Sequence, residues 1–448
     1  MPPLRAGLDR FLPEDTRRMM RLLYNLVFPV VLVATLPCYL ARMFKRGGYR
    51  RDFGQRFARY SPELRARFAE GAWIWIHAVS VGELLAALKI LEELHRRQPT
   101  WRFVVSSTTS TAHAIALEKQ KDWWAPIYTP LDLPMIVRRA LDTVRPRAIV
   151  LTESEMWPNF VWSAARRGLP VTLVNARVSP RSGRRYRRFA VALRSVTRHL
   201  SGVGLQEPEH ADLWAHLGVA PNHRHLTGSV KYDPAHTDHA PRDFKPVLHA
   251  WGISTDDPIL LAGSTHEGEE EILADALKKL RISFPSARLL IAPRHVERSA
   301  NIRERLAGAG WKIAHRSASP SGNAPDILLI DTTGELRDWY TLADVVFIGK
   351  SLCGVGGQNP VEAIQAGRPV LFGPHMENFA ELRAALEAKG GAIVVTDAES
   401  LAAAATRLLQ NPAHRDDLVA RANEALSPHR GATARTAALI EEMVKGSD

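Results

Sequence analysis

Short apolar runs alternate with helical patterns along most of the chain, and this alternation constrains the fold more than any other feature. Helical stretches such as 82–97 and 158–167 separate the first group of runs. These strand-like runs lie at 72–79, 101–108, 147–153, 170–177 and 201–206. Strands that alternate with helices form βαβ units, so the pattern predicts a parallel, doubly wound sheet.

The same alternation returns after a break. Residues 230–256 are polar and rich in proline, which is typical of an interdomain linker. Further strand-like runs follow at 258–265, 287–294, 326–332, 345–350, 368–374 and 391–397. We therefore expect an α/β chain with two Rossmann-like domains. Such folds bind ligands at the carboxyl ends of their strands, which predicts a site in a cleft between two sheets.

Chain length and cysteine content limit the class of protein. The 448 residues are enough for two or three domains. The predicted parts are an N-terminal segment (1–55), a first Rossmann-like domain (56–235), a linker (236–256), a second Rossmann-like domain (257–411) and a C-terminal helical segment (412–448). Two cysteines, Cys38 and Cys353, are too few for a disulfide scaffold or a cysteine-based metal site, and they fit a reducing cytosol.

Residues 22–40 form an apolar run near the N-terminus. As a helix, these 19 residues rise about 28 Å, close to the thickness of a bilayer core. Asn25, Pro29 and Pro37 interrupt the run, and proline inside a helix removes a hydrogen bond. A partly inserted membrane anchor is the favoured interpretation, with a short membrane span and a soluble helical hairpin as alternatives.

Positive charge is concentrated around this run. Residues 1–60 contain 12 Lys or Arg against 4 Asp or Glu, a balance of +8 within the chain's net +12. This favours an anionic membrane surface over nucleic acid as the partner. Arg42, Lys45 and Arg46 follow the run where a cleavable signal would carry small residues. We therefore expect an uncleaved anchor, with the bulk of the chain in the cytoplasm.

Two motifs in the first half place carboxylates after strands. Ser80 and Glu83 have the spacing of a helix capping box, yet Glu83 in a first helical turn could also act as a general base on a hydroxyl. Glu153 and Glu155 end another strand and suit acid–base chemistry, while Thr152 and Glu155 again have capping-box spacing. From these patterns alone, a structural and a catalytic role are both open.

An arginine-rich segment lies further along the first domain. Residues 161–200 contain ten Arg and neither Asp nor Glu, whereas a solvated surface usually mixes both signs. Because arginine binds phosphate through two parallel hydrogen bonds, residues 181–198 predict contact with a phosphorylated ligand or anionic lipid headgroups. A nucleic-acid strand is less favoured, since aromatic residues are not interleaved with these arginines.

In the second half, two stretches that follow strands suit anions. Residues 264–268 either hold a phosphate or start a helix capped through Ser264 and Glu267. Arg294 closes the next strand and is expected at the mouth of the cleft. His266, His295 and His375 lack the spacing of a metal motif, so no metal site is predicted.

The stretch 347–363 has the most specific pattern. Gly354, Gly356 and Gly357 form a glycine-rich loop before a helix that Asn359 and Pro360 begin. Amides at a helix start favour an anion. Glu362, one turn into that helix, could accept both hydroxyls of a ribose.

Eight motifs, taken in order, resemble those of the 3-deoxy-D-manno-octulosonic acid (Kdo) transferases of lipopolysaccharide synthesis. They cover nearly the whole chain, and eight in register make chance agreement very improbable. The motifs are HAVSVGE (77–83), TESEMWPN (152–159), NARVSPRS (175–182), GSVKYD (228–233), GSTHEGEE (263–270), PRHVER (293–298), DTTGEL (331–336) and GGQNPVEA (356–363).

The resemblance implies a GT-B glycosyltransferase, with two Rossmann-like domains facing a cleft and an N-terminal membrane-anchor helix. The implied reaction is an inverting transfer of Kdo from CMP-Kdo to the tetraacyl lipid A precursor. The resemblance also implies that the reaction takes place at the cytoplasmic face of the inner membrane of a Gram-negative bacterium. CMP-Kdo is then a donor substrate, no cofactor is expected, and anionic lipids rather than nucleic acid are the partners.

The resemblance also implies roles for individual residues. Glu83 is similar to the general base that deprotonates the acceptor, and Glu153 and Lys231 to groups that stabilise the transition state. The implied CMP-binding residues are Pro293, Arg294, Thr333, Gly334, Glu335, Asn359, Pro360, Val361 and Glu362. Lys350 and Gln358 depart from the family pattern, in which Gly and His are frequent there. Lys350 could add positive charge at the CMP phosphate.

Two other functions fit part of the sequence. A nucleotide-sugar epimerase on the same two-domain scaffold accounts for the second-half motifs, but it gives the apolar N-terminal run no task. A non-catalytic, membrane-docked protein that binds anionic lipid or RNA accounts for the arginines, but it leaves the glycine-rich loop unexplained.

Overall fold

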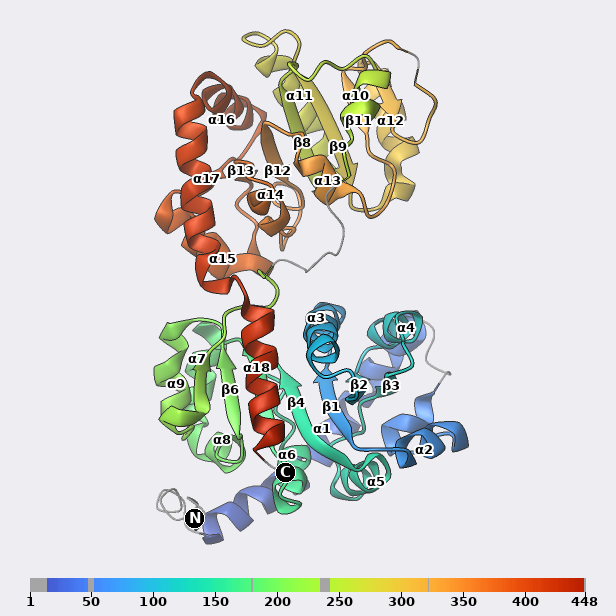
Figure 1. Cartoon of the computed structure of the whole chain (residues 1–448), viewed down its shortest axis with the longest axis vertical. Coiled ribbons are helices and arrows are strands. Elements are labelled where there is room, and N and C mark those ends of the chain that lie inside the picture. Colours follow the sequence, from blue (N-terminus) through green and yellow to red (C-terminus); the bar gives the residue numbers. More distant parts are fainter. Residues whose placement is uncertain (1–13, 47–51, 179, 234–241, 321, 447–448) are drawn as a thin grey trace. The chain divides into compact units, whose positions relative to one another are not determined.

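A computed structural model describes residues 14–46, 52–178, 180–233, 242–320 and 322–446. The chain divides into two compact units (Figure 1). Unit 1 comprises Met1–Asp233 and Gly431–Asp448, and unit 2 comprises Pro234–Arg430. The C-terminal part of the chain therefore returns to the unit in which the chain began.

Unit 1 is built on a seven-stranded parallel sheet with strand order β3-β2-β1-β4-β5-β6-β7. Its strands are β1 (Trp73–Ala78), β2 (Arg102–Ser107), β3 (Trp124–Tyr128), β4 (Pro146–Thr152), β5 (Val171–Ala176), β6 (Gly202–Leu205) and β7 (Arg224–Leu226). All six residues of β1 are buried. A central strand covered on both faces needs such a continuous apolar run, which is why β1 stands out in the sequence.

Helices cover both faces of this sheet, and alternate residues of β1 pack into different cores. Trp73 and Trp75 pack in a core with α2, α5, α6, α8 and α9, whereas Ile74 and Ile76 pack in a core with α3, α4 and α18. The helices of unit 1 are α1 (Glu14–Arg46), α2 (Pro62–Ala69), α3 (Val81–Arg97), α4 (Ser110–Glu118), α5 (Pro134–Val144), α6 (Pro158–Arg166), α7 (Pro180–Arg188), α8 (Ala190–Thr197), α9 (Ala211–His216) and α18 (Ala432–Lys445). The two-residue period of a strand produces this division.

Unit 2 repeats the architecture with strand order β10-β11-β9-β8-β12-β13-β14, again all parallel. Its strands are β8 (Ile259–Thr265), β9 (Arg288–Pro293), β10 (Ile313–His315), β11 (Ile327–Leu329), β12 (Val345–Ile348), β13 (Val370–Phe372) and β14 (Ile393–Val394). Its helices are α10 (Lys245–Ala250), α11 (Glu269–Leu280), α12 (Ser299–Gly308), α13 (Leu336–Tyr340), α14 (Val361–Gln365), α15 (Ala380–Lys389), α16 (Ala398–Gln410) and α17 (Pro412–Leu426).

The predicted strand runs are all present, and three further strands were missed. The missed strands are β3, β7 and β10, and each lies at an edge of its sheet. Edge strands need only one apolar face and tolerate proline, which is why Pro126 can lie inside β3. The proline hides β3, whose five residues are all buried, and β7 and β10 are only three residues long and lack the continuous apolar run of a central strand.

Helix α1 contains the apolar run near the N-terminus. It spans 33 residues and includes Pro29 and Pro37. By length and composition alone it could cross a membrane. Within the predicted linker 236–256 lies α10, and the predicted C-terminal segment is divided between α17 of unit 2 and α18 of unit 1.

Candidate active site

In unit 1, the end of β1 leads into α3 through a tightly bonded turn. Ser80 is the N-cap of α3, and its hydroxyl accepts a hydrogen bond from the Glu83 amide. The Glu83 carboxylate accepts hydrogen bonds from the Val79 amide and the Ser80 hydroxyl, each at 2.9 Å, and from the Thr152 hydroxyl at 3.3 Å. The predicted cap at Ser80 is therefore confirmed, and the carboxylate is held in one orientation.

Burial shifts the pKa of Glu83 in the direction that suits a general base. The residue is only 8% exposed, and this burial raises the pKa of its carboxyl above the ordinary value, with the charge of Glu153 adding to the rise. Hydrogen bonds from Val79 and Ser80 and the charge of Lys231 oppose it. A general base is most effective when its pKa lies near the working pH.

The structure brings the predicted residues Glu153 and Lys231 together beside Glu83. Lys231 Nζ lies 2.5 Å from Glu153 Oε1. Glu153 directly follows β4 and has a φ of 56°, a left-handed conformation that is costly for a residue with a side chain. Such strain is found most often where function requires an unusual direction of the chain. Lys231 and Glu83 come from distant parts of the sequence.

Glu155 is a further carboxylate at this place, and the sequence offered it together with Glu153 as a candidate for acid–base chemistry. Burial raises its pKa to about 7, and the charges of Glu83 and Glu153 contribute. The predicted capping box of Thr152 and Glu155 is wrong, because α6 begins only at Pro158. Instead, the Thr152 hydroxyl donates to the His77 carbonyl at 2.9 Å and also reaches Glu83.

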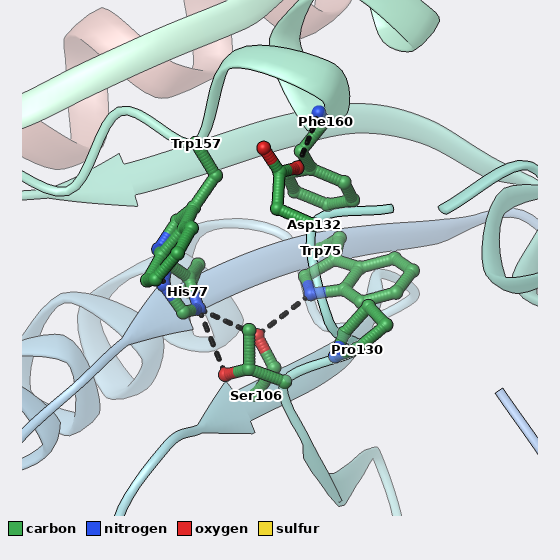
Figure 2. A pocket seen from close by; sticks show the side chains of 8 residues that line it. Trp75, His77, Ser106, Pro130, Asp132, Trp157 and Phe160 are labelled. Carbon is green, nitrogen blue, oxygen red and sulfur yellow. Dashed lines mark hydrogen bonds between the residues drawn. The ribbon is translucent and has the colours of Figure 1, made fainter. Parts of the chain in front are cut away.

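His77 lines a small buried cavity (Figure 2). Trp157 Nε1 donates to His77 Nε2 at 3.0 Å, and His77 Nδ1 lies 2.9 Å from Ser106 Oγ. Since the indole can only donate, Nε2 is the acceptor and Nδ1 carries the proton. Burial lowers the pKa of His77 to about 4 and keeps the ring neutral. The cavity, about 10 Å³, has room for about one water molecule.

In unit 2, a buried carboxylate that the sequence did not single out holds the start of the glycine-rich loop. Glu269, fully buried, accepts hydrogen bonds from the amides of Lys350 (2.7 Å), Ser351 (2.8 Å), Leu352 (3.0 Å) and His266 (2.9 Å). Lys350 has a φ of 59°. One carboxylate thus holds the turn after β12 and the turn after β8 together.

The predicted donor-binding residues lie at turns that follow strands of unit 2. Pro293 ends β9 and is buried, whereas Arg294, Thr333, Gly334, Asn359 and Glu362 are exposed. Helices α13 and α14 contact each other, which places residues 333–335 near residues 359–362. Glu335 is half-buried and accepts a hydrogen bond from the Thr332 hydroxyl at 2.6 Å. Pro360 is the N-cap of α14, and Val361 donates its amide to Asn359 Oδ1 at 3.1 Å.

Two details of this region differ from the sequence expectation. The predicted cap through Ser264 and Glu267 is wrong, because α11 begins at Glu269 after Gly268. The loop glycines are closely packed: a Cβ on Gly357 would lie 2.3 Å from Met376 Sδ, and a Cβ on Gly356 would lie 2.5 Å from Asn378 Nδ2. Glycine is needed there because the chain passes so close to its neighbours.

The arginine-rich residues 181–198 form α7 and α8. Arg184, Arg185, Arg187 and Arg188 are exposed. Phe189 and Val191, which follow them, are also exposed, at 54% and 50%. Basic and apolar side chains thus occur together on this part of unit 1.

Comparison with known structures identifies the type of fold. The chain is similar to a UDP-GlcNAc 2-epimerase from Neisseria meningitidis (14% identity, 83% of this chain, 100% of that chain, TM-score 0.55). It is also similar to a glycotransferase of kitacinnamycin (17% identity, 84% of this chain, 99% of that chain, TM-score 0.52). At these identities the likeness shows the fold alone. It confirms the predicted class of two parallel-sheet α/β domains, as in GT-B enzymes.

The sequence comparisons then identify the family. Residues 51–234 match the family model described as 3-deoxy-D-manno-octulosonic-acid transferase (kdotransferase). A relative of that name from Bordetella pertussis is 34% identical over 437 residues, covering 93% of this chain and 98% of the relative. One from Haemophilus influenzae is 31% identical over 408 residues, covering 90% and 94%. The chain belongs to the Kdo transferases, a family of glycosyltransferases.

Proposed function

We propose that this chain transfers Kdo, with inversion, from CMP-Kdo to the tetraacyl lipid A precursor at the cytoplasmic face of the inner membrane of a Gram-negative bacterium. The observation that carries the proposal is the cluster of Glu83, Glu153 and Lys231 at the carboxyl edge of the unit 1 sheet, in a chain of the Kdo transferase family.

Glu83 acts as the general base in this proposal. Its carboxylate is held by three hydrogen bonds, and its raised pKa suits it to accept a proton from a sugar hydroxyl of the acceptor. The deprotonated oxygen then attacks the anomeric carbon of Kdo from the face opposite CMP. This geometry inverts the configuration.

Glu153 and Lys231 stabilise the transition state. The sugar develops positive charge as CMP departs, and a carboxylate nearby stabilises that charge. Lys231, at 2.5 Å from Glu153, keeps the local charge balanced and limits the rise in the pKa of Glu83. The pair is in place before substrate arrives, so little reorganisation is needed.

Unit 2 binds the donor in this proposal. Glu362 is exposed on α14 and accepts hydrogen bonds from the ribose hydroxyls of CMP. Arg294 and Lys350 offset the charge of the CMP phosphate, at the two turns that follow β9 and β12. Pro293, Thr333, Gly334, Glu335, Asn359, Pro360 and Val361 complete the proposed donor site.

Helix α1 and the α7 region hold the enzyme at the lipid surface. Exposed apolar side chains follow one another on α1, among them Leu22 and Leu26 (each 71% exposed) and Val33 (67%). Such a face suits insertion into a lipid surface. The exposed arginines of α7 suit the phosphates of the acceptor and of anionic lipids.

One incubation tests the proposed function. The enzyme in detergent receives CMP-Kdo, generated in place, and the tetraacyl lipid A precursor, and the mass of the lipid is followed. We expect increments of one Kdo that disappear in the Glu83→Gln variant. An unchanged lipid together with interconversion of UDP-sugar isomers would instead identify an epimerase. Tight RNA binding with a steep salt dependence and no turnover would identify a binding protein.

A further inference from the structure

We infer that α1 is part of the acceptor-side active site as well as a membrane anchor: its inner face braces the start of α6 and so positions the loop that carries Glu153 and Glu155. The inference rests on the proposed function. It assigns positioning roles to Tyr24, Asn25 and Phe28, which share one face of α1 because Tyr24 and Asn25 lie four and three residues before Phe28.

The inner face of α1 makes polar contacts that a lipid anchor does not need. Tyr24 donates its hydroxyl hydrogen to Asp132 Oδ2 at 2.9 Å. Asn25 Oδ1 accepts a hydrogen bond from Asn159 Nδ2 at 2.7 Å. A buried polar group is costly unless it is paired, so these pairs fix both the rotation and the height of α1 on unit 1.

Asp132 links these contacts to α6. Its carboxylate accepts the amide hydrogens of Asn159 and Phe160, the second and third residues of α6, each at 2.9 Å. Figure 2 shows the bond to Phe160. Asp132 therefore caps the helix from a distant part of the chain, and Tyr24 supplies a third donor to the same carboxylate. The side chain is 2% exposed, so it depends on these donors.

Aromatic contacts continue from α1 toward the catalytic loop. Phe28 packs edge-on against Trp157, with 6.4 Å between ring centroids, and Tyr24 packs edge-on against Trp162 at 5.8 Å. Trp157 stands two residues after Glu155 and donates to His77 Nε2. The His77 carbonyl accepts from Thr152, whose hydroxyl also reaches Glu83. Every step from α1 to Glu83 is thus a direct contact.

Two explanations of α1 give different expectations. If α1 is only an anchor, loss of its inner polar contacts changes nothing once the enzyme and the lipid share a detergent micelle. If α1 braces the loop, the same loss lowers kcat in the micelle and leaves donor binding in unit 2 unchanged. The second result follows because misplacement of carboxylates by about 1 Å can cost about 100-fold in rate.

The experiment compares the full chain with Tyr24→Phe/Asn25→Ala, in detergent, for kcat, the KM of each substrate and amide hydrogen exchange. Thr35→Val is the matched control, because within the part of the chain that the structure describes the Thr35 hydroxyl bonds to carbonyls of α1 itself, those of Val31 and Leu32. We expect kcat to fall about tenfold in the double variant with the donor KM unchanged. We expect faster exchange of amides 155–161, and wild-type values for the control.

Several outcomes overturn the inference: an unchanged kcat, a fall in kcat without faster exchange, or an equal effect of Thr35→Val. If the double variant does not fold, the single Tyr24→Phe change keeps both ring contacts and removes one oxygen. It should lower kcat about threefold and speed exchange at Asn159 and Phe160. If the proposed function is wrong, the wild-type enzyme transfers no Kdo. The hydrogen-exchange comparison of the variants tests the bracing by α1 independently of that result.

Discussion

The strand ends of unit 1 and the corresponding turns of unit 2 present their polar groups in opposite ways. In unit 1, Lys231 pairs with the partly buried Glu153, and the buried Glu83 carboxylate beside them accepts a hydrogen bond from Thr152. In unit 2, a buried carboxylate, Glu269, fixes the backbone, and the predicted donor residues Arg294 and Glu362 extend into solvent. Under the proposed function, this difference corresponds to preorganised charges for chemistry in unit 1, and to a rigid frame with adaptable contacts for binding in unit 2.

The largest effect is expected from Glu83→Gln. The change removes the proposed base and keeps its shape, so kcat should fall about 1,000-fold with CMP affinity unchanged. The cap is partly retained, so the free energy of unfolding should fall by about 1 kcal/mol or less. Rapid-quench kinetics measure the fall in kcat, and calorimetric titration measures the affinity for CMP. Retained activity with reduced stability would mean that Glu83 only caps α3.

Lys231→Met should lower kcat about 100-fold, because it removes preorganised charge at the transition state. It should also shift the pH profile. Lys231 lowers the pKa of Glu83, so its loss raises that pKa, and the acidic limb of kcat should move to higher pH. If the acidic limb of the kcat–pH profile does not move, Lys231 does not influence the pKa of Glu83.

Glu269→Gln tests the frame of unit 2. A neutral amide has one accepting oxygen where the carboxylate serves four amides, so we expect a loss of about 2–3 kcal/mol in stability and about tenfold weaker CMP binding. Thermal unfolding and calorimetric titration measure these quantities. The pH profile of kcat at saturating donor should remain that of the wild type, and a change in it would contradict the division between the units.

Glu362→Ala should have the smallest effect. The residue is exposed on α14, so the structure should persist, and loss of one acceptor for the ribose hydroxyls should raise the donor KM about fivefold. Steady-state kinetics with varied CMP-Kdo measure it, with the neighbouring exposed Gln365→Ala as control. An unchanged donor KM would show that Glu362 does not bind the ribose hydroxyls.

Local patterns predicted the frame of the molecule better than its long-range contacts. Central strands and the Ser80 cap follow from short-range sequence, because burial on both faces and capping leave local signatures. The pairing of Glu153 with Lys231 joins residues far apart in the chain, and the family resemblance suggested a shared role for them but not the pairing. Glu269 and Asp132 bond to amides of other turns, so their neighbours in sequence give no sign of their partners.

A crystal structure with CMP bound tests the division between the two units most directly. We predict that the nucleotide lies in unit 2 beside residues 356–362, with its phosphate near Arg294 or Lys350. We also predict that Glu83 still accepts from Val79 and Ser80, and that Lys231 still pairs with Glu153. CMP bound against Glu83 in unit 1, or a Glu83 carboxylate turned away from Glu153, would contradict the account.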